Sequence, residues 1–190
     1  SGPGVSANGS GDVLLEARGG DLVINADVVS GAGNLTLDAD NELVVNAAVT
    51  TGGSGMVYLR SGNNATLGAQ LTIVSGDILI ESGSDVFLAD LITSSGGSVG
   101  LFVGGMLTQT ASGDVIAGGD ILIEADTVWK MSGDTVITAG GNVVGNAFGG
   151  DLTLGIITGE NVALTASGSI VDANADLLNV TAENLSLRAD

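Results

Sequence analysis

The sequence repeats itself about every 22 residues, and this repeat limits the possible folds more than any other feature. Residues 76–81 return unchanged as residues 119–124. Aligning the chain on this segment exposes nine strand-like segments. Their first apolar positions are Val13, Leu35, Val57, Ile78, Val99, Ile121, Val143, Val162 and Leu185. A period of this length built from short apolar runs is typical of a solenoid.

Two further columns follow each first apolar position at intervals of two residues. The second column is Leu or Ile except at Gly145, and the third column is mostly Ala or Ser. Alternation with period 2 predicts a β-strand with one buried face. A second strand follows in each repeat, and then a short third strand marked by Val28, Val49, Leu71 and Ile92. Such strands bury their apolar face only by stacking on the next repeat.

We therefore predict an all-β fold, a single-stranded parallel β-helix or β-solenoid, with three short strands per coil, about 22 residues per coil and nine coils. Coils that rise by about 4.8 Å each would form a rod roughly 40 Å long. Residues 1–10 are predicted to be a lead-in or a cloning remnant, and residues 11–190 an excerpt of a longer solenoid. The columns blur between residues 106 and 158, so the register there is left open.

Charge and composition exclude several classes of function. The chain has 22 acidic and 4 basic residues and a net charge of −18. This argues against nucleic acid as a partner, because binding to phosphates requires basic side chains. No apolar run approaches the ~20 residues of a membrane-spanning helix, so no membrane insertion is predicted. The absence of Cys and His excludes disulfides and all catalysis based on these residues.

Four residues are candidates for surface contacts. Tyr58 and Phe87 each lie between two inward residues, so their side chains should point to solvent. Trp129 beside Lys130 is the right pair of residues to stack on a sugar ring. Glycan or protein contacts at Trp129, Lys130, Tyr58 and Phe87 are one interpretation of this pattern, and the favoured alternative is that these are the scattered exposed apolar groups common on protein surfaces.

Other chemistries find less support in the sequence. The calcium-binding β-roll nonapeptide and the EF-hand spacing are both absent, so no metal or cofactor is predicted. A polysaccharide lyase or hydrolase needs clustered carboxylates, usually with a basic partner, and the few basic residues are widely spread. Ice binding needs a flat threonine array, and the threonines at positions 36, 50, 51, 66, 72 and 93 do not fall into one unbroken column.

The pattern Gly-Asp/Asn-aliphatic-x-Leu-x-Ala with Gly-Gly turns, clearest over residues 150–170, resembles the repeats of filamentous-haemagglutinin-like adhesins of Gram-negative bacteria. The resemblance covers nearly the whole chain from Gly11. It implies a right-handed β-helix, export through an outer-membrane transporter, and an extracellular location at the cell surface. The Asn-Pro motif of that family's secretion domain is absent.

The resemblance thus predicts a structural or adhesive shaft rather than an enzyme. It implies a host-cell, glycan or neighbouring-cell ligand through the parent protein, and lateral self-association is a further option. The alternative is a glycan- or protein-binding module that uses an exposed aromatic patch.

Overall fold

The structure, a computed structural model, describes residues 2–190, and it confirms the predicted β-solenoid. All regular elements of these residues are β-strands, which form three parallel sheets. We name the sheets A, B and C. Successive strands along the chain belong to sheets A, B and C in turn, so each strand pairs with strands one coil before and one coil after it.

Sheet A contains nine strands: β1 (Val5–Ala7), β4 (Val28–Ser30), β7 (Val49–Thr51), β10 (Leu71–Ile73), β13 (Ile92–Ser94), β16 (Val115–Ala117), β19 (Val136–Ala139), β22 (Ile156–Thr158) and β25 (Val180–Thr181). Sheet B also contains nine: β2 (Val13–Ala17), β5 (Leu35–Ala39), β8 (Val57–Ser61), β11 (Ile78–Ser82), β14 (Val99–Val103), β17 (Ile121–Ala125), β20 (Val143–Ala147), β23 (Asn161–Ala166) and β26 (Asn184–Ala189). Sheet C contains eight: β3 (Leu22–Ile24), β6 (Leu43–Val45), β9 (Ala65–Leu67), β12 (Val86–Leu88), β15 (Leu107–Gln109), β18 (Trp129–Met131), β21 (Leu152–Leu154) and β24 (Ile170–Asp172).

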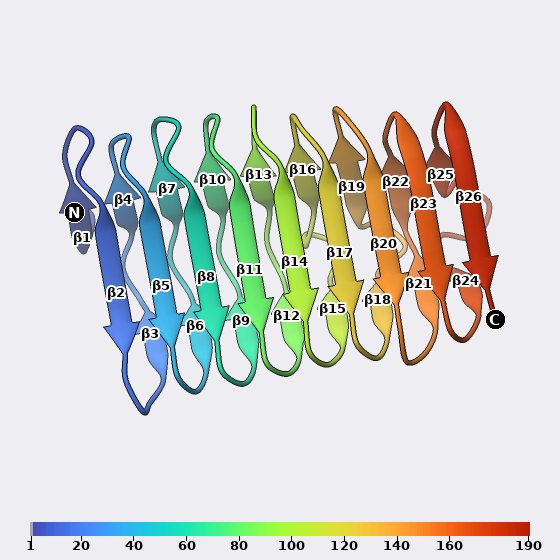
Figure 1. Cartoon of the computed structure of the whole chain (residues 1–190), viewed down its shortest axis with the longest axis horizontal. Helices are drawn as coiled ribbons and strands as arrows, with labels where there is room; N and C mark the ends of the chain where they lie inside the picture. The colour runs from blue at the N-terminus through green and yellow to red at the C-terminus, as the bar shows by residue number, and fades with distance from the viewer. Residues whose placement is uncertain (1) are drawn as a thin grey trace.

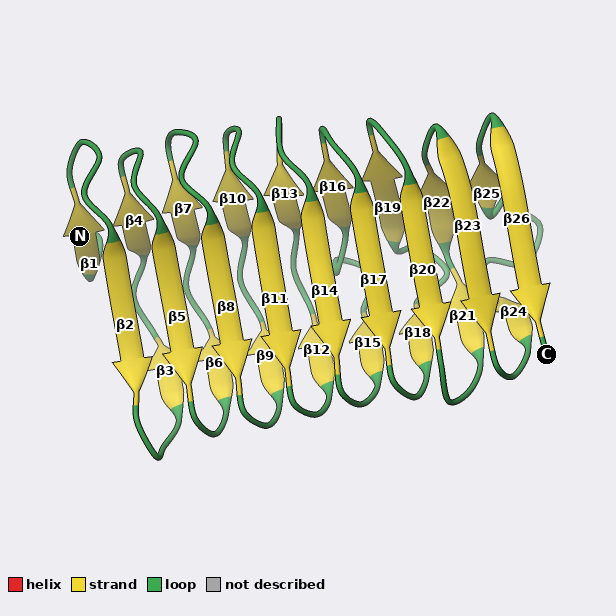
Figure 2. Cartoon of the chain, in the orientation of Figure 1, coloured by secondary structure: helices red, strands yellow, loops and turns green. Residues whose placement is uncertain are grey.

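The coil is right-handed. In Figure 1 the strands of sheet B run downward in front and those of sheet A run upward behind, while the coils advance from left to right. The loops lie at the corners between sheets (Figure 2). The eight strands of sheet C mark eight complete turns, and β26 begins a ninth with a strand of sheet B alone.

The three inward columns of sheet B are confirmed by the pairing register. Leu35, for example, pairs with Val57, Leu37 with Leu59, and these four side chains are fully buried. Like residues therefore stack on like residues, and one aliphatic core runs through the whole rod. Within it, every buried side-chain nitrogen or oxygen of the described residues has a hydrogen-bond partner.

The solenoid begins earlier than residue 11. Strand β1 pairs in parallel with β4, and Val5 and Ala7 pack against the core. Part of the expected lead-in is thus the first strand of sheet A, because its alternating Val5 and Ala7 continue the inward columns of that sheet.

Between residues 106 and 158, the coils differ from the first four coils mainly in the length of the corner between sheets C and A. This corner consists of residues 25–27, 46–48, 68–70 and 89–91 in the first four coils. It lengthens to residues 110–114 and 132–135 in the next two, shrinks to Gly155 alone, and then widens to residues 173–179. Gly155 accounts for most of the short step after Val143. The strands on either side keep their pairing, so the register that the sequence left open is fixed by the coils above and below.

Candidate functional site

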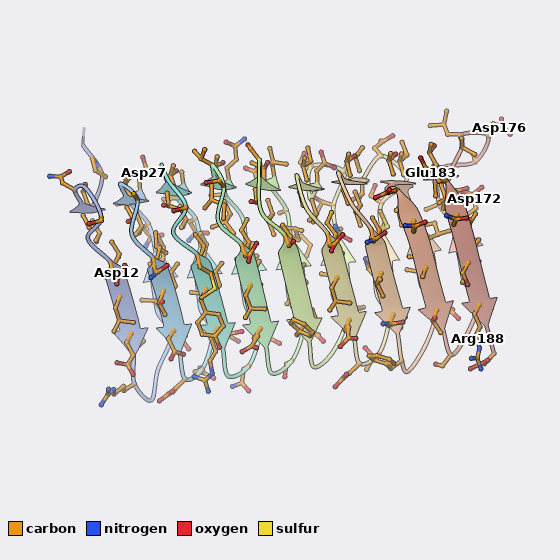
Figure 3. All side chains as sticks on the ribbon, turned by 45° about the horizontal axis from the view of Figure 1, so that its top comes forward. Asp12, Asp27, Asp172, Asp176, Glu183 and Arg188 are labelled. Atoms are coloured by element: carbon orange, nitrogen blue, oxygen red, sulfur yellow. The ribbon has the colours of Figure 1, made fainter. Side chains whose placement is uncertain are left out.

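Many of the acidic side chains at the corners accept hydrogen bonds from backbone N–H groups. Asp12 accepts a hydrogen bond from the backbone N–H of Asn34 at 2.7 Å, and Asp120 accepts one from the N–H of Asn142 at 2.7 Å. Carboxylates of one coil thus satisfy backbone donors of the next coil. Figure 3 shows the labelled Asp12 and Asp27 near the N-terminal end of the rod, at two different corners of the solenoid. Among residues 2–190, no three acidic side chains gather in a group that could hold a metal ion.

Trp129 does not lie on the surface, and the predicted Trp129–Lys130 sugar platform is wrong. Alternation in β18 points Trp129 and Met131 into the core and Lys130 to solvent. The indole is fully buried, and its N–H donates to Oε1 of Gln109 at 2.6 Å. The amide of Gln109 in turn donates to the carbonyl oxygen of Gly113 at 2.9 Å. The tryptophan is therefore a core residue with a satisfied polar tip, as buried indoles require.

The space for the indole comes from Gly145 on the facing strand β20. A Cβ atom at Gly145 would lie 2.3 Å from Cζ3 of Trp129. The one glycine in an otherwise Leu and Ile column was the sequence signal that a large side chain fills the core from another sheet. Trp129, on sheet C, is that side chain.

The three remaining candidates are exposed to different degrees and do not form one patch. Tyr58 is partly exposed on the outward face of sheet B. Phe87, 44% exposed, and Lys130 lie on the outward face of sheet C, in β12 and β18. Strand β15 separates these two strands, and Thr108 is the neighbour of both residues in the register.

A shallow groove of about 390 Å³ lies at the corner between sheets B and C and is a candidate site. Its lining consists of Arg60, Ser61, Gly62, Glu81, Ser82, Gly83, Phe102, Val103, Gly104, Glu124 and Asp126. Phe102 stands between Glu81 and Glu124 in the register of sheet B. The groove thus offers an aromatic edge with a carboxylate on either side.

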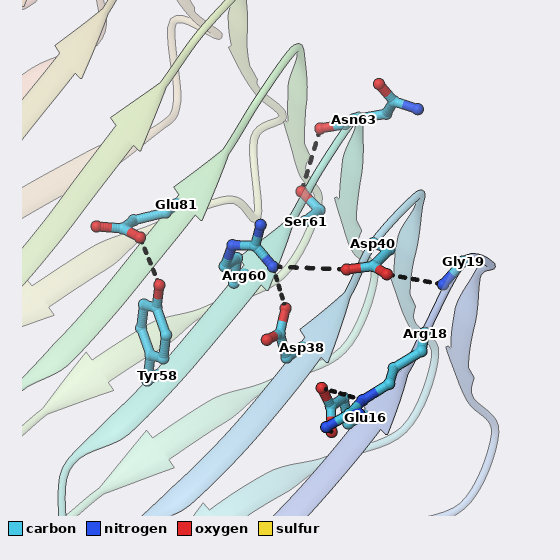
Figure 4. A network of polar contacts seen from close by, with 10 residues as sticks. All are labelled: Glu16, Arg18, Gly19, Asp38, Asp40, Tyr58, Arg60, Ser61, Asn63 and Glu81. Carbon is cyan, nitrogen blue, oxygen red and sulfur yellow. Dashed lines mark hydrogen bonds and ion pairs between the residues drawn. The ribbon is translucent and has the colours of Figure 1, made fainter.

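The groove continues into a polar network over the first coils (Figure 4). The guanidinium of Arg60 donates to Asp38 at 2.7 Å and lies 3.9 Å from Asp40. The sequence columns place Arg60 between Asp38 and Glu81, but Glu81 instead accepts a hydrogen bond from the hydroxyl of Tyr58. The exposed ion pairs of Arg60 add little stability.

Three glycines of successive coils line the groove, because the stacking of the coils leaves no room for a side chain at these positions. A Cβ atom at Gly62 would lie 2.1 Å from the carbonyl oxygen of Asp40, and one at Gly83 would lie 2.1 Å from that of Gly62. On the sheet beside the groove, a Cβ at Gly100 would lie 3.2 Å from the ring of Phe102. The phenyl ring therefore rests against the backbone of Gly100.

The Tyr58 hydroxyl is a probe of this network that can be measured directly. Partial burial and the hydrogen bond to the Glu81 carboxylate raise the pKa of Tyr58 to about 12. Tyr58 is the only tyrosine in the chain, so the absorbance of its phenolate during an alkaline titration reports this pKa alone. We expect a midpoint near that value, and a lower midpoint in Glu81→Gln. An ordinary tyrosine midpoint in the native chain would contradict the contact.

The same shift has a consequence for stability. The folded chain holds the phenolic proton to higher pH than the unfolded chain does. This contribution is therefore present below the ordinary tyrosine pKa of about 10 and is lost as the pH rises through about 12.

No known protein family, curated protein or solved structure matches this chain. No helix within residues 2–190 is long and apolar enough to cross a membrane.

Proposed function

We propose that the chain is a shaft segment of a secreted cell-surface adhesin, a stiff spacer that holds a binding end away from the cell. The observation that carries this proposal is the single uninterrupted core, in which every complete coil is paired with its neighbours in three sheets. Bending such a rod would open hydrogen bonds and buried contacts on one side. The resemblance to filamentous-haemagglutinin-like repeats supports the same role.

A spacer function makes length the relevant quantity. Deleting residues 78–98 removes one coil and joins Asp77 to Val99, which occupy consecutive positions of the repeat. We expect the variant to keep its β-sheet circular dichroism and its rod to shorten by about 4.8 Å. Small-angle X-ray scattering measures this change. A collapsed or unfolded variant would show that the coils are not interchangeable.

The direct test of the shaft role is display. The chain, fused between a membrane anchor and a module of known binding specificity, should extend the reach of that module in proportion to the number of coils. The purified chain alone should not bind glycan arrays or host cells. Reach that does not change with coil number would overturn the proposal.

The second candidate function is glycan binding in the groove at the corner between sheets B and C. It is favoured by Phe102 flanked by Glu81 and Glu124, because sugars stack on aromatic rings and donate hydroxyl hydrogens to carboxylates. Glycan binding that is lost in Phe102→Ala, and kept in Phe87→Ala on sheet C, would make the chain a binding module in its own right.

A further inference from the structure

The outward face of sheet A carries one unbroken column of β-branched residues. The register aligns one outward residue from each of the strands β4 to β25: Val29, Thr50, Thr72, Thr93, Ile116, Thr138, Thr158 and Thr181. The register pairs each member with the next, without a slip. Six of these eight are threonines, so the column presents hydroxyl and methyl groups at the strand spacing of about 4.8 Å.

The hydroxyls of this column are free to meet a ligand. Within residues 2–190 none of the six threonine hydroxyls hydrogen-bonds to a protein group. The inward hydroxyls of the same sheet behave differently, since Thr51 donates to the carbonyl oxygen of Gly33 at 3.4 Å and Ser94 to that of Gly76 at 2.6 Å. Because β-branched side chains have restricted rotamers, the outward groups are already ordered before any ligand binds.

This face is uncharged, although the chain has a net charge of −18. No strand of sheet A contains a charged residue. At the corner that precedes sheet A, Asp27 accepts a hydrogen bond from the N–H of Ala48 at 3.2 Å and Asp114 from that of Val136 at 2.7 Å, whereas Asp134 and Asp176 are exposed. At the opposite corner, the strands are followed mostly by glycine, as at Gly118 and Gly140. The strands of this face are therefore neutral, and few side chains project from the corner that follows them.

The dimensions of the strip argue against a second copy of the chain as the ligand. Three residues per strand and nine strands give an area of about 10 by 40 Å. Two such faces would bury about 800 Å² in total, below the ~1,200 Å² of stable protein interfaces. A narrow, neutral, regularly spaced surface fits a ligand that is itself an extended and uncharged lattice.

We propose that the outward face of sheet A binds the surface of ice. The methyl groups exclude disordered water, and the hydroxyls take positions in an ordered water lattice at repeated intervals. Many weak contacts then act together without any charge to favour liquid water. The sequence alone argued against this activity, because Thr36 and Thr66 belong to other faces and Thr51 is buried, whereas Thr138, Thr158 and Thr181 complete the column.

The test compares two tyrosine variants of the whole chain. Thr93→Tyr places a large side chain in the middle of the column, whereas Thr108→Tyr makes the same change at the central outward position of β15, on sheet C. Both threonines are partly exposed, so both variants should keep the fold, which circular dichroism checks. Ice-growth inhibition is measured as the gap between the melting and freezing points, and binding as the share of protein taken into a slowly growing ice crystal.

We expect the native chain and Thr108→Tyr to inhibit growth and enter the ice equally, and Thr93→Tyr to lose most of both effects. The proposal is overturned if the native chain is excluded from ice, or if the two variants lose activity to the same extent. Sedimentation of the native chain with microcrystalline cellulose, lost in Thr93→Tyr and without any ice activity, would assign the face to a polysaccharide lattice instead. These outcomes do not depend on whether the rod is an adhesin shaft.

Discussion

Replacing Trp129 by Ala is expected to lower the free energy of unfolding by about 3–5 kcal/mol. The indole is fully buried and packs against Gly145, which cannot fill the space that would be left. The change also removes the donor to Gln109, whose buried side-chain oxygen would then lack its partner. Both losses act at the same place in the core.

The measurement is equilibrium urea denaturation, followed by circular dichroism. The matched control is Lys130→Ala, the exposed neighbour on the same strand, which should change the unfolding free energy by no more than about 0.5 kcal/mol. If Trp129 were a surface platform for sugars, both variants would be equally mild. A small effect of Trp129→Ala would therefore count against its buried placement.

The second large effect is expected at Gly76, at the corner between sheets A and B. A Cβ atom there would lie 2.1 Å from the carbonyl oxygen of Gly55 in the preceding coil, and one at Gly55 would lie 2.0 Å from that of Gly33. The obstructing atoms are backbone, so no side-chain rotation relieves the overlap. Gly76→Ala should therefore destabilise the chain by about 3 kcal/mol, at the upper end of typical overpacking costs.

Gly20→Ala is the matched control for this prediction. A Cβ atom at Gly20 has no neighbour within 4 Å, so this variant should unfold at nearly the same urea concentration as the native chain. Thermal melts of the two variants give the same comparison independently. Equal stability of Gly76→Ala and the native chain would mean that the coils do not approach each other as closely as the structure has them.

Much of the fold was predictable because its determinants are local. The alternation in segments such as residues 78–82 predicts a strand and its buried face, and the regular period predicts the stacking of equivalent strands. Tyr58 and Phe87 point outward as alternation requires. Even the short step after Val143 indicated a shortened coil, which the structure places at Gly155.

Trp129 was less predictable because the corner that follows its strand varies in length. The segment Trp129-Lys130-Met131 lacks the two aliphatic residues that mark the inward positions of β12 and β21, so its inward direction was not evident from one strand. The glycine opposite it, Gly145, was visible in the sequence, but linking the two required the position of sheet C relative to sheet B. The corner groove likewise depends on three glycines from successive coils lying side by side.

The sequence by itself determined the repeat, the three short strands of each coil and the inward columns, because residue spacing within a strand decides which side chains share a face. Only the tertiary structure decided the handedness, the burial of Trp129 and the column of threonines on sheet A. The handedness depends on the direction in which the chain crosses from one strand to the next. The other two features depend on which residues of different coils lie next to each other after corners of unequal length. Stacking of the coils sets that alignment, since an extra corner residue shifts the count along the chain without shifting the strands that pair.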